Sequence, residues 1–296
     1  MIYRIVHTTR FTYDEPAYES HNEVRLTPRD GMGQRLVAFR LDVDPPAAVI
    51  EFDDAYGNRV QAISVTPPHE TLTIVARSGV EPVARVPARV RDVPLDEFLA
   101  EDLARTSERY DFLSPTRYVP FSERLRKFFW SVRPGRAEGV GEYTDRVLRC
   151  VRDQFEYEAG TTNVHSTVDA ILDEGGGVCQ DFAHLALGVL RLAGIPARYV
   201  SGYLVPPDDP SGIRGAVGEQ ASHAWIEVLL PGQDWVGFDP THRCRAGDHH
   251  LRVAVGRDYG DVPPVRGVYR SRGTRQWMNI GLEVEAVPML SEHVEQ

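Results

Sequence analysis

The stretch that decides the fold runs from Gly175 to Pro196 and reads GGGVCQDFAHLALGVLRLAGIP. After the glycines, the segment from Cys179 to Ala193 is apolar on nearly every side, which predicts a helix that is buried all round. Gly194 suits the left-handed position that follows a helix, and the proline two residues later prevents the helix from continuing. The sequence therefore predicts a central buried helix that begins at a cysteine.

Cys179 lies where negative charge on sulfur is stabilised. The unpaired backbone N–H groups and the positive dipole of a helix start favour a thiolate. The same N–H groups can donate to the oxyanion that forms when an acyl carbonyl becomes tetrahedral. The alternative is a buried core thiol, which is a common fate of free cysteine. Cys150 and Cys244 are interpreted in that second way, as ordinary structural thiols.

Two predicted strands downstream supply partners for a reactive thiol. Residues 223–230 and 235–239 alternate in polarity around a Pro-Gly turn, which predicts an antiparallel hairpin. If odd positions pair with odd positions, Asp239 lies beside or diagonal to His223. One ring nitrogen of His223 would then face Cys179 while the other donates to Asp239, which is the logic of a catalytic triad. The alternatives are a core histidine and an aspartate that only begins a turn.

Other polar residues near the helix are interpreted as structural or left without a role. Asp181 lies in the first turn, where it stabilises the helix dipole but opposes a thiolate. His184 is turned about 140° around the helix from Cys179, and we expect it to be buried and hydrogen-bonded. His249 and His250 follow a polar turn without nearby acidic or thiol ligands, so no metal site is predicted there.

Composition excludes several classes of function. The chain has 296 residues, with 33 Lys and Arg against 43 Asp and Glu, and the net charge of −10 argues against nucleic acid or an anionic membrane as partner. The three cysteines form no C-x-x-C pair, which argues against a zinc ribbon and fits a reducing compartment. No signal-peptide pattern opens the sequence, and no apolar run approaches the ~20 residues needed to span a bilayer. These features lead us to expect a cytoplasmic protein.

The rest of the chain divides into three predicted parts. Residues 1–86 alternate in polarity between turns at about ten-residue spacing, which predicts a β-sandwich. Residues 87–140 show helical periodicity and are predicted to form a helical linker or elaboration. Residues 141–296 are predicted to form the core that carries the site, with strands near the C-terminus completing its sheet.

Three short motifs occur in an order and spacing that resemble a known family. They are GVCQDFA from Gly177, SHAW from Ser222 and GFDPT from Gly237, and together they resemble the core of the transglutaminase-like superfamily. Four flanking motifs resemble the bacterial branch whose members carry an N-terminal β domain and are described as cysteine proteases. These are FTYD from Phe11, ESHNEVRLTP from Glu19, DAYGN from Asp54 and GRDYGDVPP from Gly256. The resemblance covers almost the whole chain, and it is weakest near residues 90–140.

The resemblance implies a fold and a site. The expected fold class is α+β, with an N-terminal β-sandwich followed by a papain-like core in which a buried catalytic helix packs on an antiparallel sheet. Cys179 is the implied nucleophile, His223 the base and Asp239 the orienting group, and the chemistry requires no metal or organic cofactor. Candidate substrate or oxyanion contacts are Tyr157, Gln180 and Trp225, although ordinary aromatic packing explains Tyr157 and Trp225 as well.

The same resemblance implies the substrate class without choosing the reaction. A peptide or protein amide is the expected substrate, including the products of a peptide-ligating enzyme. Transfer of the acyl group to an amine gives a transglutaminase, whereas transfer to water gives a peptidase or amidase. A non-catalytic module that only binds a peptide is the remaining alternative. The motifs say nothing about oligomeric state.

Overall fold

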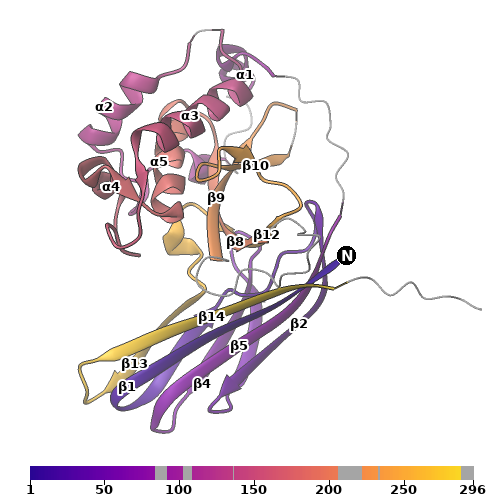
Figure 1. The fold of residues 1–296 in the computed structure, drawn as a ribbon, viewed down its shortest axis with the longest axis vertical. Helices are drawn as coiled ribbons and strands as arrows, with labels where there is room; N and C mark the ends of the chain where they lie inside the picture. The colour runs from indigo at the N-terminus through magenta and orange to yellow at the C-terminus, as the bar shows by residue number, and fades with distance from the viewer. Residues whose placement is uncertain (84–91, 103–108, 136, 206–221, 233, 288–296) are drawn as a thin grey trace, which may run out of the picture.

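The computed structural model describes residues 1–83, 92–102, 109–135, 137–205, 222–232 and 234–287. It confirms the α+β class: a helical core with its own sheet lies above a long N-terminal sheet (Figure 1). The Pro, Gly and Asp residues of the stretch from about 205 to 221 predict a long loop, and residues 206–221 of this stretch lie outside the described residues. No helix in the described part of the chain has the length and apolar character needed to cross a membrane.

The N-terminal sheet has seven antiparallel strands arranged around β1 (Ile2–Val24). Its other strands are β2 (Gln34–Asp44), β3 (Ala48–Asp53), β4 (Arg59–Val65), β5 (His69–Pro82), β13 (Val265–Ser271) and β14 (Gln276–Val287). The first half of β1 pairs with β5 and β14, and its second half pairs with β4 and β13. The register shifts between Thr12 and Ala17, where the sequence Asp-Glu-Pro interrupts the alternation.

One hydrophobic core joins the two halves of this sheet. Phe11 and Tyr13, before the register shift, lie in the same buried cluster as Val24 and Ile63, which belong to the other half. The predicted sandwich is therefore one continuous sheet. Its two halves meet at the register shift in β1 and share one hydrophobic cluster.

The C-terminal strands correct one part of the predicted organisation. We expected the stretches 251–255 and 278–287 to complete the sheet of the core. The first does so as β12 (His250–Gly256), but the second, in β14, pairs with β1, as β13 also does. Leu282 and Val284 of β14 are buried with Tyr3 and Ile5 of β1. Alternating polarity predicts that a segment is a strand and which face is buried, but it carries no information on the partner strand.

The core contains a second antiparallel sheet, in the order β11-β10-β9-β8-β12. Its strands are β8 (Ala197–Leu204), β9 (Ser222–Leu229), β10 (Trp235–Asp239), β11 (Cys244–Arg245) and β12 (His250–Gly256). The helices are α1 (Leu95–Asp102), α2 (Glu123–Val132), α3 (Val140–Gln154), α4 (Val168–Glu174) and α5 (Cys179–Leu192), with short 3-10 turns η1 (Tyr110–Phe112) and η3 (Tyr259–Asp261). Two short parallel strands, β6 (Glu156–Tyr157) and β7 (Gly176–Gly177), precede α5.

Helix α5 is the centre of the core, as its sequence predicts. Every residue from Gln180 to Arg191 is buried, with β8 and β9 on one side of the helix and α2, α3 and α4 on others. The helix is followed by Gly194 at φ 81°, the left-handed conformation expected there. Helix α5 packs against β9 and β8 of the core sheet, and β9 carries His223 (Figure 1).

Buried polar contacts tie the core to the N-terminal sheet. Asn58 is fully buried; its amide nitrogen donates to the Val255 carbonyl at 2.7 Å, and its amide oxygen accepts from the Val255 N–H at 2.8 Å. Gln34 makes a similar pair of bonds with the backbone of Arg252. These specific contacts fix the orientation of the sheet that carries His223 against the N-terminal half.

Candidate active site

Cys179 is the first residue of α5, and the chain before it is shaped by glycine. The short strands β6 and β7 hold the glycine run, with the N–H of Glu158 donating to the Gly177 carbonyl at 3.0 Å. A β-carbon on Gly177 would come within 2.7 Å of a carboxylate oxygen of Asp181, so only glycine fits. Cys179 itself is partly buried, at a helix start where backbone N–H groups and the helix dipole stabilise negative charge.

Asp181 caps this helix, which confirms its structural interpretation. Its Oδ2 accepts from the Val178 N–H at 2.9 Å and from the Thr162 hydroxyl at 2.5 Å. Burial raises the pKa of Asp181, although these hydrogen bonds act in the opposite direction. His184 is fully buried, and its Nε2 accepts from the Tyr259 N–H at 3.2 Å, also as expected.

The hairpin of β9 and β10 brings His223 and Asp239 together. Gly237 pairs with Glu227 and Phe238 pairs with Ile226, so odd positions face odd positions, which confirms the predicted register. Asp239 consequently lies diagonal to His223 on the same face of the sheet. The His223 Nε2 is 2.8 Å from the Asp239 Oδ2, and both side chains are buried.

The other side of the His223 ring faces Cys179. The Cys179 thiol interacts with the His223 side chain, and Nδ1 is the ring nitrogen that the bond to Asp239 leaves for this interaction. Burial by itself lowers the pKa of His223, but the hydrogen bonds to Asp239 and Cys179 outweigh burial and raise the pKa to about 9. Burial disfavours charge on Asp239 too, yet hydrogen bonds from histidines hold its pKa well below the usual range. The Asp239 carboxylate thus favours the charged imidazolium form of His223.

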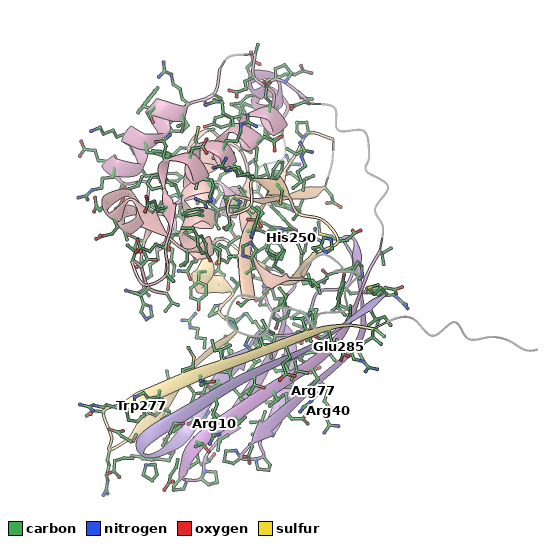
Figure 2. All side chains as sticks on the ribbon, viewed as in Figure 1. Arg10, Arg40, Arg77, His250, Trp277 and Glu285 are labelled. Carbon is green, nitrogen blue, oxygen red and sulfur yellow. The ribbon has the colours of Figure 1, made fainter. Side chains whose placement is uncertain are left out.

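Two further histidines bind the same carboxylate, and the sequence did not point to either. The His242 Nδ1 lies 2.8 Å and the His250 Nε2 lies 3.0 Å from the Asp239 Oδ2. His242 follows Asp239 by three residues, a spacing typical of an aspartate-centred turn, and that signal was available. His250 begins β12, at the opposite edge of the sheet, so only the fold brings it here (Figure 2).

The three secondary candidates have different environments. Tyr157 is half exposed, and its hydroxyl interacts with the backbone N–H and the thiol of Cys179. The Gln180 amide instead donates to the Val164 carbonyl at 3.4 Å. Trp225 is fully buried behind His223, with ring centroids 6.1 Å apart, so it is not placed to touch a substrate. Strand alternation put Trp225 on the same face as His223, but it could not show that the His250 ring packs edge-on against Trp225.

The cluster around Asp239 also has the residue types of a metal site. Ligand atoms of His223, Asp239 and His250 lie within 4.8 Å of one another. The His250 Nδ1, however, accepts a hydrogen bond from the Gly247 N–H at 3.3 Å, so the proton of the neutral ring resides on Nε2, facing Asp239. A metal-binding histidine does the reverse, donating its outer N–H and binding metal through the bare nitrogen. The donor set therefore fits a hydrogen-bonded network better than a metal centre.

A cavity of about 720 Å³ lies between the N-terminal sheet and the core. Its walls carry the aromatic side chains of Phe11, Tyr13, Tyr118, Tyr259 and Tyr269 and the guanidinium groups of Arg117, Arg257 and Arg266. Val164 lines this cavity, and its carbonyl accepts the hydrogen bond from Gln180, the neighbour of Cys179. One residue thus links the cavity wall to the start of α5.

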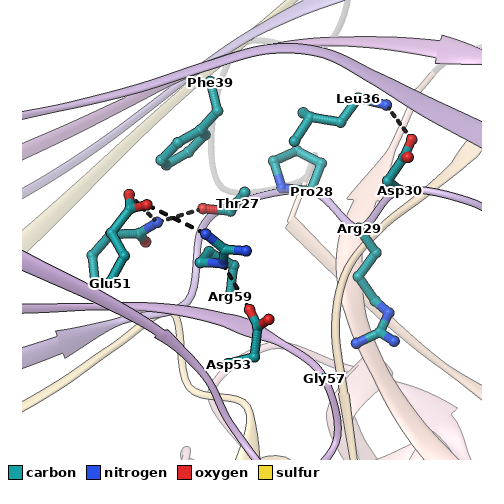
Figure 3. Close-up of a pocket in the computed structure, with 11 residues that line it drawn as sticks. Thr27, Pro28, Arg29, Asp30, Leu36, Phe39, Glu51, Asp53, Gly57 and Arg59 are labelled. Atoms are coloured by element: carbon teal, nitrogen blue, oxygen red, sulfur yellow. Dashed lines mark hydrogen bonds and ion pairs between the residues drawn. The ribbon is translucent and has the colours of Figure 1, made fainter.

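A smaller hollow of about 480 Å³ lies within the N-terminal sheet (Figure 3). Its polar side chains bind one another: Arg59 pairs with Asp53 at 2.7 Å, and Gln61 donates to Thr27 at 2.8 Å and to Glu51 at 3.2 Å. Because these groups are already paired, the hollow has less to offer a polar ligand than the cavity between the halves.

Comparison with known proteins finds matching families and relatives. Residues 3–81 match the bacterial transglutaminase-like N-terminal region, and residues 132–240 match the transglutaminase-like superfamily. A protein of Mycobacterium leprae is 37% identical over 273 residues, which cover 91% of this chain and 94% of that protein. The protein-glutamine gamma-glutamyltransferase of Pseudomonas aeruginosa is 38% identical over 122 residues, which are 40% of this chain but 18% of that enzyme.

A solved structure shares the fold over nearly the full length. The crystal structure of a candidate cysteine protease from Cytophaga hutchinsonii superimposes with a TM-score of 0.70 at 23% identity. The match covers 96% of this chain and 98% of that one. It includes both halves of the molecule, so the pairing of an N-terminal sheet with this type of core recurs in a second protein.

Proposed function

Because this chain belongs to the transglutaminase-like superfamily, we propose that it is a cysteine-dependent enzyme that transfers the acyl group of a peptide or protein amide. One observation carries the proposal. The His223 ring bridges the Cys179 sulfur at the start of a helix and the buried Asp239 carboxylate. This is the chain of contacts by which an imidazole activates a thiol and is itself oriented.

The first half-reaction uses all three residues. The Cys179 thiolate adds to the amide carbonyl, and the resulting oxyanion is stabilised by N–H groups at the start of α5 and by the Tyr157 hydroxyl. The tetrahedral species collapses to a thioester as the C–N bond breaks. The His223 imidazolium gives its proton to the leaving amine and is left neutral.

The second half-reaction decides between the two enzyme classes. Neutral His223 removes a proton from the incoming nucleophile, which attacks the thioester, and the sulfur leaves as thiolate paired with imidazolium. A primary amine yields a new amide, and water yields a carboxylic acid. The same residues serve both outcomes, so the acceptor determines the reaction.

We propose further that the peptide on one side of the reacting amide lies in the cavity between the two halves. Aromatic walls suit an extended chain, and Arg117 and Arg266 suit acidic side chains, whereas Arg257 is paired with Asp261 in the same wall. Arg266→Glu should raise KM for an acidic peptide about tenfold with little change in kcat. Arg10→Glu, on the opposite face of the sheet from Phe11, is the matched control and should leave KM unchanged (Figure 2). Equal KM values for both variants would remove the cavity from the substrate path.

The decisive experiment incubates the protein with a glutamine-containing peptide, with and without a primary amine, and follows product mass. A new amide identifies transamidation, a mass gain of about one dalton identifies deamidation, and fragments identify peptide hydrolysis. Cys179→Ala should abolish every product, and Cys244→Ala, an exposed thiol, should abolish none. Tight peptide binding with no product across varied peptides and amines would instead support a non-catalytic binding module.

A further inference from the structure

The Asp239 carboxylate accepts more hydrogen bonds than a triad requires. Its Oδ2 lies within 3.0 Å of ring nitrogens from His223, His242 and His250. Its Oδ1 accepts from the backbone N–H groups of Thr241 at 2.8 Å and His242 at 3.2 Å. The side chain is completely buried, so these bonds take the place of its hydration.

His250 is held in the state that donates to this carboxylate. The Gly247 N–H occupies its Nδ1, which leaves the proton on Nε2, the atom 3.0 Å from Asp239. The side chain of His250 is 7% exposed, and its ring lies edge-on against Trp225, with centroids 5.2 Å apart. His250 therefore reaches Asp239 as a neutral N–H donor with little freedom to turn away.

His242 approaches the same oxygen from the protein surface. Its side chain is half exposed, and its ring lies 5.2 Å from the His223 ring between centroids. Within the part of the chain that the structure describes, the other titratable groups that face the pair are Cys179 and Tyr157 on the His223 side and Cys244 on the Asp239 side. Among these groups, His250 is the buried one that binds Asp239 without touching Cys179.

We propose that His250 is a positioning residue of the acyl-transfer site. It holds the Asp239 carboxylate in the orientation that His223 needs, and it limits how much of the carboxylate's negative charge interacts with His223. The inference rests on the proposed function and names a residue that the triad does not include. A carboxylate that accepts three hydrogen bonds through one oxygen shares its charge among them. Without the bond from His250, Asp239 is freer to rotate, so it holds the His223 ring less well toward Cys179. The charge that His250 no longer shares is then available to the protonated His223 ring.

The test is the rate at which iodoacetamide alkylates Cys179 as a function of pH, read by mass on the peptide that contains Cys179. His250→Leu removes the donor, and we expect the rate at neutral pH to fall about 10-fold, the lower end of what removing an orienting partner costs. The pH at which His223 loses its proton should move upward. His250→Gln keeps an N–H donor near the same place and should restore both the rate and the profile.

A merely structural role for His250 predicts a different pattern. Both substitutions would then lower the melting temperature while the pH profile of the folded protein stays as in the wild type, and that result would overturn the inference. His242→Ala, at a half-exposed position, provides a variant that should fold and should shift the profile less than His250→Leu.

Alkylation requires no substrate, so the two proposals can fail separately. Suppose that no peptide is turned over, but the pH profile of Cys179 alkylation shifts in His250→Leu and recovers in His250→Gln. The proposed role of His250 is then supported and the acyl-transfer function is contradicted. Suppose instead that the wild type turns over peptide, and His250→Leu keeps the wild-type rate and pH profile of Cys179 alkylation. The acyl-transfer function is then supported and the role of His250 is contradicted.

Discussion

Two carboxylates are fully buried on one face of the core sheet, and they have opposite surroundings. Glu227 on β9 pairs with Arg198 at 2.6 Å and with Arg252. Asp239 on β10 meets three histidines. Arginine stays protonated throughout the range in which proteins work, whereas histidine changes charge near neutral pH. The first site is therefore a permanent ion cluster, and the second is able to exchange protons.

The position of each cluster matches that difference. Arg252 also donates to the Met32 carbonyl of the N-terminal half, so the Glu227 cluster helps join the two parts of the molecule. Burial raises the pKa of Glu227, but the two arginines outweigh burial and lower it. The pKa of Asp239 is lowered as well, but by hydrogen bonds from histidines, and one of these, His223, faces Cys179. The two carboxylates have similar burial and equal charge. Glu227 stabilises the contact between the two halves, whereas Asp239, in our proposal, takes part in the reaction.

The largest expected effect tests the proposed catalytic role of Asp239. Asp239→Asn should reduce kcat by about 10²- to 10⁴-fold, because an amide cannot stabilise the His223 imidazolium. Acyl transfer to a primary amine at saturating peptide measures the loss. Circular dichroism should show that the variant is still folded. A variant with wild-type kcat would remove Asp239 from the proposed triad.

A stability effect of nearly comparable size is expected at the other carboxylate. Glu227→Gln leaves Arg198 and Arg252 without a counter-charge in a buried site, which should cost about 3–5 kcal/mol of unfolding free energy. Urea denaturation measures it. We expect kcat per folded molecule to stay within about twofold of the wild type, since Glu227 touches no reacting group. A selective loss of kcat without loss of stability would mean that the two clusters are not separate in role.

The pH dependence of His223 sharpens the contrast. Its pKa of about 9 in the folded protein lies above the ordinary value of 6.5, so protonation favours the folded state. That stabilisation is fully present below pH 6.5 and is lost as the pH rises through about 9. The wild type should therefore lose stability over this interval, and His223→Ala should lose less. Denaturation midpoints measured at several pH values for both proteins check this, and parallel curves would contradict it.

The smallest expected effect concerns metal ions. Because the His250 proton faces Asp239, we expect prolonged treatment with EDTA to leave the acyl-transfer rate unchanged. Adding back Zn²⁺ at stoichiometric concentration should not increase the rate either. A loss of activity in EDTA that Zn²⁺ restores would show that the histidines around Asp239 hold a metal, contrary to the tautomer we infer.

Much of the site follows from short stretches of sequence. Three features depend on residues that are close along the chain. They are the burial of α5, its glycine-supported start at Cys179, and the odd-with-odd hairpin register that places Asp239 diagonal to His223. Helix periodicity, capping and hairpin register are local properties, so the sequence predicts them. The roles proposed for these residues still await the experiments above.

The contacts that sequence reasoning missed all join distant segments. The strands β13 and β14 pair with β1, His250 reaches Asp239 from the far edge of the sheet, and Trp225 is covered rather than open to a substrate. The sequence by itself determined a buried helix that begins at a cysteine and a hairpin that carries a histidine and an aspartate. Only the tertiary structure decided strand partners and the three-histidine network, because these depend on how sheets are ordered and packed, and no pattern within a few residues encodes that order.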